Sequence, residues 1–520
     1  MRQLSRQDAA CLYTDTVHSN HNVSLLHIFD QATAPGGVVR FKAILAQIQR
    51  RLHRSPLFRQ RLQGVPLGLD RPYWVDDANF DLEYHVRHIA LPKPGDWRLF
   101  CIQASRLHAR PLDLDRPLWE VYVIEGLDSF LDLPAGSFAL LLKTHQAAVD
   151  LGLLAELSAD LLDDSAASRM PPAPPEPWFA QATPGPLRLA RRGALRALRS
   201  PLRLATPLLQ QAWRAAPATL SRAGGLLLQP PGLPVTRFSS VVSPHRVFET
   251  RRFAESDIMA IAGLVPGATV DDVVLTLCGD ALRRYLLVQH ELPPTLDLQA
   301  QVHWPQAGAA AQRRQVTLAT TLQDPVQGLS AVKRQRLADA RTPAASSSLL
   351  SKARQWLAPA CSKPGQPAGL PLTLANARIT MLPAQAEPLY LCGARLCYVS
   401  AILPIQDGLG LAFAVNRYDG LLVISPTSCR ELLPDPDLLA QCLRDSFQDL
   451  LALAQGKAVA VVTPTKPQAA PARSRRVAKL RAKPGAKPST TAEPGAARRL
   501  TAAGAGASAS GSSRRKRPAA

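Results

Sequence analysis

The chain has 520 residues, 46% of them hydrophobic, and a net charge of +21, which suggests two to four domains with large cores and excludes global disorder. No apolar run reaches the roughly 18 to 20 residues that span a bilayer, and the polar start lacks a signal-peptide core, so we expect neither an integral membrane nor a secreted protein. The eight cysteines form no CxxC pair and no Cys/His cluster at metal-ligand spacing, which favours a reducing cytoplasm and no metal site.

The N-terminal part alternates helical and strand patterns. The segment FKAILAQIQRRLHRSPLFRQRL has apolar residues at helical spacing, whereas LWEVYVI and SFALLLKTH are typical of short buried strands. AAVDLGLLAELSADLL then returns to a helical period. We therefore predict a mixed α/β domain in which strand and helix meet at His145.

A proline-rich stretch from Pro171 to Pro186 predicts a linker, because proline breaks both helices and ladders. After it, no acidic residue occurs between Glu176 and Glu249, while arginines and leucines interleave from Arg188 to Arg203. This pattern is typical of an amphipathic helix on an anionic membrane surface. A connecting helix packed on its own protein is the alternative.

The C-terminal part repeats the mixture. DDVVLTLCGDALRRYLL predicts a helix, and PLYLCGARLCYVSAILPI, GLGLAFAVN and GLLVISPT predict strands separated by Gly, Asp and Pro. The fold class is therefore mixed α/β, with two domains. We expect an N-terminal domain, a linker with the basic amphipathic stretch, a C-terminal domain and a tail, at residues 1–170, 171–236, 237–456 and 457–520.

The tail holds 15 Lys or Arg against a single acid, Glu493, and has no aromatic residue. Such a composition cannot bury enough apolar surface to offset the entropy of ordering, so we predict disorder. Its charge suits anionic lipid, or nucleic acid bound without sequence preference.

The segment LLLKTHQAAVDLG is the most informative for chemistry, because a strand delivers His145 and Gln146 to a turn and Asp150 to the following helix. A lone His at such a place is more often a hydrogen-bonded structural residue. No phosphate-binding glycine loop, HExxH or GxSxG competes with this segment. His18 and His21, in the polar segment TVHSNHN, are interpreted as surface residues.

Several segments together resemble a known family. VPLGLDRPYWVDD, FDLEYHVRH, RLHARPLDLDRPLWEVYVIEGL, GATVDDVVLTLCGDALRRYL and PLYLCGARL are similar to segments of the bacterial wax ester synthase and acyl-CoA:diacylglycerol acyltransferase (WS/DGAT) family. The resemblance covers nearly all of residues 1–455. It includes the PLWE segment, which consists of Pro117, Leu118, Trp119 and Glu120 and is expected to be structural. We expect Trp119 to pack in the core.

The resemblance implies the chloramphenicol acetyltransferase-like fold of CoA-dependent acyltransferases, with two similar domains and a substrate channel at their interface. It implies that the second His of an HHxxxDG motif is the general base that takes the proton of the acceptor hydroxyl. Here that motif reads His145-Gln146-Ala147-Ala148-Val149-Asp150-Leu151. The base position is therefore Gln146, whose amide cannot accept the proton, while Asp150 is expected to be structural and held by a basic partner.

Two further family segments depart from the pattern. The ND pair reads Asp271-Asp272, and the SNVPGP segment begins with Thr380 and Met381. We expect these four residues on the opposite wall of the channel. The pattern fits a framework that is retained while catalytic contacts have changed, or ordinary divergence with retained activity.

Two functions follow from the resemblance. The first is O-acyl transfer from acyl-CoA to diacylglycerol or a long-chain alcohol, using His145, Gln146 and Asp150, with no metal or bound cofactor and acyl-CoA as cosubstrate. The second is a catalytically inactive relative that binds lipid. In either case we expect a cytoplasmic protein on the inner membrane face or on lipid inclusions.

Overall fold

The computed structural model contains one compact unit, Met1–Pro467, that includes all of the described residues. The predicted tail at 457–520 lies outside the described residues, as does much of the predicted linker. The structure describes residues 1–66, 70–128, 133–134, 136–167, 178–198, 233–306, 309–341 and 375–456.

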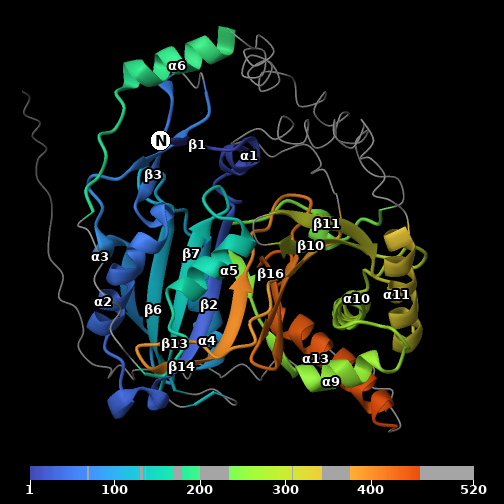
Figure 1. Ribbon diagram of the computed structural model, residues 1–520. Coiled ribbons are helices and arrows are strands. Elements are labelled where there is room, and N and C mark those ends of the chain that lie inside the picture. The colour runs from blue at the N-terminus through green and yellow to red at the C-terminus, as the bar shows by residue number, and fades with distance from the viewer. Residues whose placement is uncertain are drawn as a thin grey trace, which may run out of the picture. The chain divides into compact units, whose positions relative to one another are not determined.

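The first half of the chain builds most of a six-stranded sheet (Figure 1). Its order is β13-β14-β2-β7-β6-β5, and only the β5–β6 pair is parallel. The strands are β2 (Asn22–Asp30), β5 (Val86–Ala90), β6 (Trp119–Leu127), β7 (Ser137–His145), β13 (Tyr390–Leu391) and β14 (Ala394–Ile402).

Strand β7 is central to this sheet, and every one of its residues is buried. Alternate side chains point to opposite faces of a strand, so Phe138 and Leu140 join one core while Ala139 and Leu141 join the other. A strand covered on both faces needs apolar residues at successive positions. This explains the unbroken run SFALLL that predicts it.

Helices cover both faces of the six-stranded sheet. Helix α4 (Trp97–Ala109) begins at the capping residue Asp96 and packs Phe100 and Leu107 under one face. Helices α2 (Phe41–Arg51) and α5 (Leu151–Asp160) contribute to the core on the other face. The predicted strands and the helix after His145 are confirmed, whereas the helical pattern that starts at Phe41 is α-helical only to Arg51 and gives way to short 3-10 turns and strand β3 (Gln60–Gln63).

The second half builds a seven-stranded sheet in the order β11-β10-β12-β15-β16-β8, with β9 also paired to β16. β12 runs parallel to both β10 and β15, and the other pairs are antiparallel. The strands are β8 (Arg246–Phe248), β9 (Arg251–Ala254), β10 (Gln299–Gln306), β11 (Ala309–Thr317), β12 (Ala377–Met381), β15 (Ala412–Tyr418) and β16 (Leu421–Cys429).

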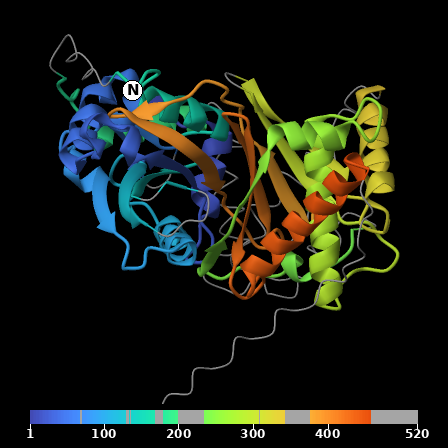
Figure 2. The same ribbon diagram turned by 90° about the horizontal axis from the view of Figure 1, so that it is seen from below.

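Four helices pack with this second sheet, and Figure 2 shows α13 in red lying beside the green α10. Helix α10 begins with a capping box, in which Thr269 and Asp272 satisfy each other's backbone N–H groups. The helices are α9 (Glu255–Ala262), α10 (Val270–Val288), α11 (Pro325–Arg341) and α13 (Pro436–Ala454).

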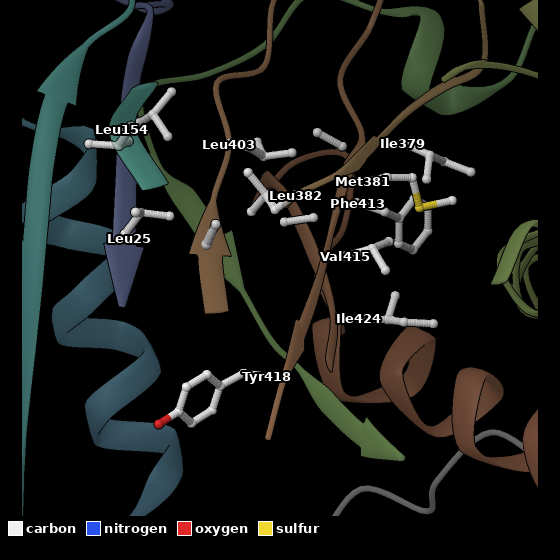
Figure 3. Packing of buried hydrophobic residues seen from close by; sticks show 14 of the residues in the cluster. Leu25, Leu154, Ile379, Met381, Leu382, Leu403, Phe413, Val415, Tyr418 and Ile424 are labelled. Carbon is white, nitrogen blue, oxygen red and sulfur yellow. The ribbon is translucent and has the colours of Figure 1, made fainter. Parts of the chain in front are cut away.

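The two sheets are linked by a strand that crosses between the halves of the chain and by a common hydrophobic core. Strand β14, from the second half, pairs with β2, so the expected domain ranges 1–170 and 237–456 are crossed by one strand. One hydrophobic core also joins them, since Leu25 and Leu154 of the first half belong to the same cluster as Leu382 and Leu403 (Figure 3). The seam between the halves is therefore fixed by backbone pairing as well as by packing.

Smaller elements lie around the first half. A three-stranded sheet has the order β1-β4-β3, and helix α6 lies where the basic amphipathic helix is predicted. Within the described residues, no helix is long and apolar enough to cross a membrane. The elements are β1 (Arg2–Gln3), α1 (Arg6–Thr14), β3 (Gln60–Gln63), β4 (Tyr73–Asp76), α3 (Leu82–His85) and α6 (Pro186–Leu198).

Candidate functional site

His145 ends strand β7 and is almost fully buried, with 1% of it exposed. Its Nε2 lies 2.8 Å from Asp15 Oδ2, and its Nδ1 lies 3.0 Å from the backbone N–H of Ala147. Since Nδ1 accepts a hydrogen bond from the N–H of Ala147, the ring proton of the neutral imidazole belongs on Nε2, which donates a hydrogen bond to Asp15. Both ring nitrogens of His145 are therefore occupied by the protein.

Gln146 follows in the turn and is partly exposed. Its backbone N–H donates to the backbone oxygen of His21 over 2.9 Å. No hydrogen bond of its side-chain amide occurs within the part of the chain that the structure describes. The amide is consequently available to a ligand, although it has no useful basicity.

Asp150 is exposed and caps helix α5. Its Oδ1 accepts a hydrogen bond from the backbone N–H of Leu153 over 2.8 Å. Among the described residues no basic side chain pairs with it, so its observed contact differs from the expected ion pair. A carboxylate at a helix N-terminus is stabilised by the free N–H groups and the helix dipole, without a basic partner.

Asp15 and His21 form a pair that the sequence analysis missed. His21 Nδ1 lies 2.7 Å from Asp15 Oδ1, which also accepts the backbone N–H of His21 over 3.0 Å. The interpretation of His21 as a surface residue is wrong, because only 14% of its side chain is exposed. No local signal in the segment TDTVHSNH reveals this contact, since the residues between the pair form an irregular loop.

The electrostatics around Asp15 favour the carboxylate. Burial raises the pKa of Asp15, but hydrogen bonds from His145 and His21 outweigh burial and leave the pKa below its ordinary value. Asp15 therefore stays ionised at neutral pH. One carboxylate thus links two imidazoles, whose ring centroids lie 6.3 Å apart.

The predicted pair Asp271-Asp272 divides between two roles. Asp272 is fully buried, closes the capping box of α10 and pairs with Arg336 Nε at 2.9 Å. Asp271 accepts a hydrogen bond from Trp304 Nε1 over 2.9 Å and lines an open hollow beside β12. Only Asp271 is placed to meet a ligand.

Thr380 and Met381 end strand β12 and point to opposite sides of it. Met381 lines the same hollow as Asp271. Thr380 is fully buried, its Oγ1 has no partner among the described residues, and it lies opposite His303 of β10. Burial, followed by the charges of Arg378 and Arg313, lowers the pKa of His303 to about 3, so this imidazole stays neutral.

The PLWE segment belongs to the framework, as expected for a structural motif. Trp119 Nε1 donates to the backbone oxygen of Phe58 over 3.0 Å, and the indole stacks on His85 with centroids 4.5 Å apart. Glu120 pairs with the buried Lys143 at 3.2 Å. Leu118 is 1% exposed, and Pro117 bridges to the strand β3 residue Arg61.

Two adjoining hollows differ in position, since the first lies at the seam between the halves and the second is lined by residues of the second half. The first, of about 720 Å³, is lined by β2, α5 and the β12–β15 region, and includes Leu25 and His27. The second, of about 550 Å³, includes Asp271 and Met381, and both hollows share Leu382 and Arg417. His145, Gln146 and Asp150 line neither hollow, so the structure groups the predicted residues into two separate sets.

The described residues contain no cluster of three or more His, Cys, Asp or Glu that could hold a metal ion. What the first set offers instead is proton chemistry, with an ionised carboxylate, two imidazoles and a free amide. The second set offers an apolar seam with few polar groups.

Two family models match the chain. The wax ester synthase/diacylglycerol acyltransferase catalytic domain matches residues 4–274, and the WS/DGAT C-terminal domain matches residues 314–451. The two matches occur in the family's order, and residues 275–313, which include strand β10, lie between them. The resemblance inferred from sequence segments is thereby confirmed.

Relatives agree with these matches. MT1809 of Mycobacterium tuberculosis, provisionally named a diacylglycerol O-acyltransferase, is 30% identical over 483 residues, covering 87% of this chain and 90% of the relative. MT3848 of the same organism, with the same provisional name, is 30% identical and covers 86% of this chain and 99% of the relative.

A solved structure has the same fold. The wax ester synthase/diacylglycerol acyltransferase of Marinobacter aquaeolei VT8 aligns with a TM-score of 0.65 and 24% identity, over 87% of this chain and all of that chain. The predicted mixed α/β class is confirmed.

Proposed function

Because this chain belongs to the wax ester synthase/diacylglycerol acyltransferase family, a family of acyltransferases, we propose that it transfers a fatty acyl group from acyl-CoA to diacylglycerol or a long-chain alcohol. The observation that carries this proposal is the match of both family domains, in order, across the two sheets. Acyl-CoA is a cosubstrate, and the reaction needs no metal or bound cofactor.

The seam suits such substrates. The first hollow is bordered by apolar side chains of Leu25, Leu389 and Val399, which favour an acyl chain because its burial removes apolar surface from water. The second hollow adds Asp271 and Met381 at one wall. Gln146 can donate a hydrogen bond to an acceptor hydroxyl or a thioester carbonyl, or accept one from the hydroxyl, but it cannot remove a proton.

A catalytically inactive relative that binds lipid is the second candidate, favoured specifically by Gln146 at the position of the expected base. In that case the hollows hold lipid without turnover. The two candidates differ in one observable, the formation of an ester, and agree in another, the binding of acyl chains.

The test is a product assay with the purified full chain. Labelled palmitoyl-CoA is incubated with hexadecanol or with diacylglycerol, and neutral lipids are separated and counted against heat-denatured protein. Labelled wax ester or triacylglycerol supports the enzyme. If no labelled product forms while a fluorescent fatty acyl-CoA still binds, the inactive lipid-binding candidate is correct.

We also propose that helix α6 attaches the protein peripherally to an anionic membrane or lipid-inclusion surface on the cytoplasmic side. Leu189 is fully buried against Val65 and Tyr73, so one face of the helix docks on its own protein. The residues Leu187 and Leu195 are 86% and 50% exposed. Exposed arginines accompany them, at Arg188, Arg191 and Arg192.

This arrangement combines both interpretations of the basic stretch, because the helix is anchored and still presents leucines and cations to a surface. Each cation near an anionic membrane contributes on the order of 1 kcal/mol. Changing Arg188, Arg191 and Arg192 to Glu should therefore abolish most sedimentation with anionic liposomes. The same change at the exposed Arg40 is the control, and unchanged sedimentation of the triple variant would contradict the proposal.

A further inference from the structure

The turn after β7 contains a carboxylate shared by two imidazoles. Asp15 Oδ2 lies 2.8 Å from His145 Nε2, and Asp15 Oδ1 lies 2.7 Å from His21 Nδ1. The side chain of Asp15 is 24% exposed and that of His21 is 14% exposed, whereas that of His145 is 1% exposed. Solvent therefore reaches this cluster at Asp15 and His21 and not at His145.

The two imidazoles use different nitrogens to bind the carboxylate, and only one of them keeps a nitrogen lone pair that can accept a proton. His145 binds Asp15 through Nε2 and occupies Nδ1 with the backbone N–H of Ala147, so it keeps no free lone pair. His21 donates its Nδ1 proton to Asp15, which leaves the lone pair on Nε2. Within the described parts of the chain, no group bonds to His21 Nε2.

His21 also lies next to the position at which the base is expected. The β2–β7 register pairs Asn22 with His145, and one further step brings His21 opposite Gln146. The hydrogen bond from Gln146 N–H to the His21 oxygen, at 2.9 Å, confirms this position. Opposite residues in an antiparallel pair lie roughly 5 Å apart. The His21 residue therefore lies opposite Gln146, the position at which the family resemblance expects the base.

We propose that His21 is the general base of the acyl transfer, that Asp15 orients its ring, and that His145 is a positioning residue that holds Asp15. This proposal rests on the proposed acyltransferase function. It also explains why the first His of the motif is retained although the second is replaced, since His145 is needed to fix the carboxylate. Gln146 is then left with hydrogen bonding to the substrate alone.

The proton and bond changes balance without another reactant. His21 Nε2 takes the proton of the acceptor hydroxyl as its oxygen forms a bond to the thioester carbonyl carbon. The tetrahedral intermediate then collapses, the C–S bond breaks, and the departing CoA sulfur takes the proton back from the imidazolium. The ionised Asp15 stabilises the imidazolium in between, as a carboxylate does for a histidine base in general.

The deciding variant is His21→Asn in the full chain. The amide nitrogen of Asn replaces the Nδ1 donor to Asp15, while no group replaces the Nε2 lone pair. We expect a 10²- to 10⁴-fold lower kcat for ester formation, the usual contribution of a positioned general base, with the KM for palmitoyl-CoA within about twofold. His18→Asn is the matched control, because His18 is exposed in the same loop, and it should keep the wild-type kcat.

The outcomes separate this proposal from the proposed function. If the wild-type chain forms ester and His21→Asn forms it equally fast, His21 is not the base and only this proposal is overturned. If the wild-type chain forms no ester, both are overturned. Should His21→Asn lose its cooperative melting, His21→Gly with free imidazole decides, since restored turnover supports the base and unrestored turnover in a folded variant contradicts it.

Discussion

Two polar clusters each include a residue of strand β7, Lys143 in one and His145 in the other, and they differ in whether a polar group is left without a partner. In the interior of β6 and β7, Glu120 pairs with Lys143 and also accepts the Tyr122 hydroxyl at 2.8 Å. At the end of β7, Asp15 joins two imidazoles, but His21 Nε2 has no partner among the described residues. A closed cluster can only stabilise the fold, whereas an open one keeps a group for a ligand.

The closed cluster should give the largest stability effect. Lys143 is completely buried, so removing its charge takes the ammonium partner from the buried Glu120, which keeps only the half-exposed Arg87, at 3.5 Å, and the Tyr122 hydroxyl among the described residues. Lys143→Met should lower the free energy of unfolding by about 3 to 5 kcal/mol, because water does not reach the buried carboxylate to replace the lost ammonium group. Denaturant or thermal unfolding measures this loss.

Glu125→Ala is the matched control on β6, the strand that carries Glu120. Glu125 pairs with His88 at 3.0 Å, but both side chains are well exposed. Exposed pairs contribute about 0 to 1 kcal/mol, so this variant should melt close to the wild type. Equal losses in the two variants would show that burial does not distinguish these clusters.

A third polar group, His27, sharpens the comparison through pH. His27 lies on β2, bonds Ser158 Oγ through Nε2 at 3.1 Å, and lacks a partner at Nδ1 among the described residues. Burial lowers its pKa from 6.5 to about 4. The folded state therefore resists protonation, and stability that is present above pH 6.5 is lost as pH falls toward 4.

The size of this loss is on the order of 3 kcal/mol for such a pKa difference. His27→Gln cannot titrate and keeps a donor for Ser158, so its melting temperature should fall less between pH 7 and pH 4 than that of the wild type. Parallel melting curves for the two proteins over this range would contradict a buried neutral His27.

Asp150 should give a smaller effect than either buried group. It is exposed, and its observed role is to cap α5 through the N–H of Leu153. Asp150→Ala should therefore cost about 0.5 to 2 kcal/mol, whereas Asp150→Ser should restore most of it. A loss well beyond this range, or a Ser variant no better than Ala, would indicate a partner other than the helix end.

Gln146 should give the smallest stability effect of all. Its side chain is partly exposed and makes no hydrogen bond within the described residues. Gln146→Ala should change the free energy of unfolding by less than about 0.5 kcal/mol, as is usual for such positions. A larger loss of unfolding free energy, measured in urea, would show that this amide has partners within the protein, as the Glu120–Lys143 pair does.

The fold was predictable where a local residue pattern is compatible with only one kind of secondary structure. The run SFALLL predicts β7 because apolar residues at successive positions are typical of a strand covered on both faces, and the alternation of helix and strand predicts a mixed fold. The pairing of β14 with β2 was not predictable. These strands are separated by hundreds of residues, and no local pattern specifies a partner at that distance.

The site was predictable only in its motif residues. The order of the segment places His145, Gln146 and Asp150 at one turn, and the structure keeps them there. The contact between Asp15 and His145 spans 130 positions and joins an irregular loop to a strand end, so no spacing rule contains it. Likewise, the exposure of Asp150 depends on how neighbouring chain covers the turn.

The most direct measurement compares two variants of the full chain in one assay, Gln146→Ala and His21→Asn, by their rates of ester formation from labelled palmitoyl-CoA and hexadecanol. If the open cluster is the catalytic one, Gln146→Ala keeps a rate within about tenfold of the wild type, while His21→Asn falls by a factor of 10² to 10⁴. A wild-type rate in His21→Asn, or no ester from any of the three proteins, would contradict the account.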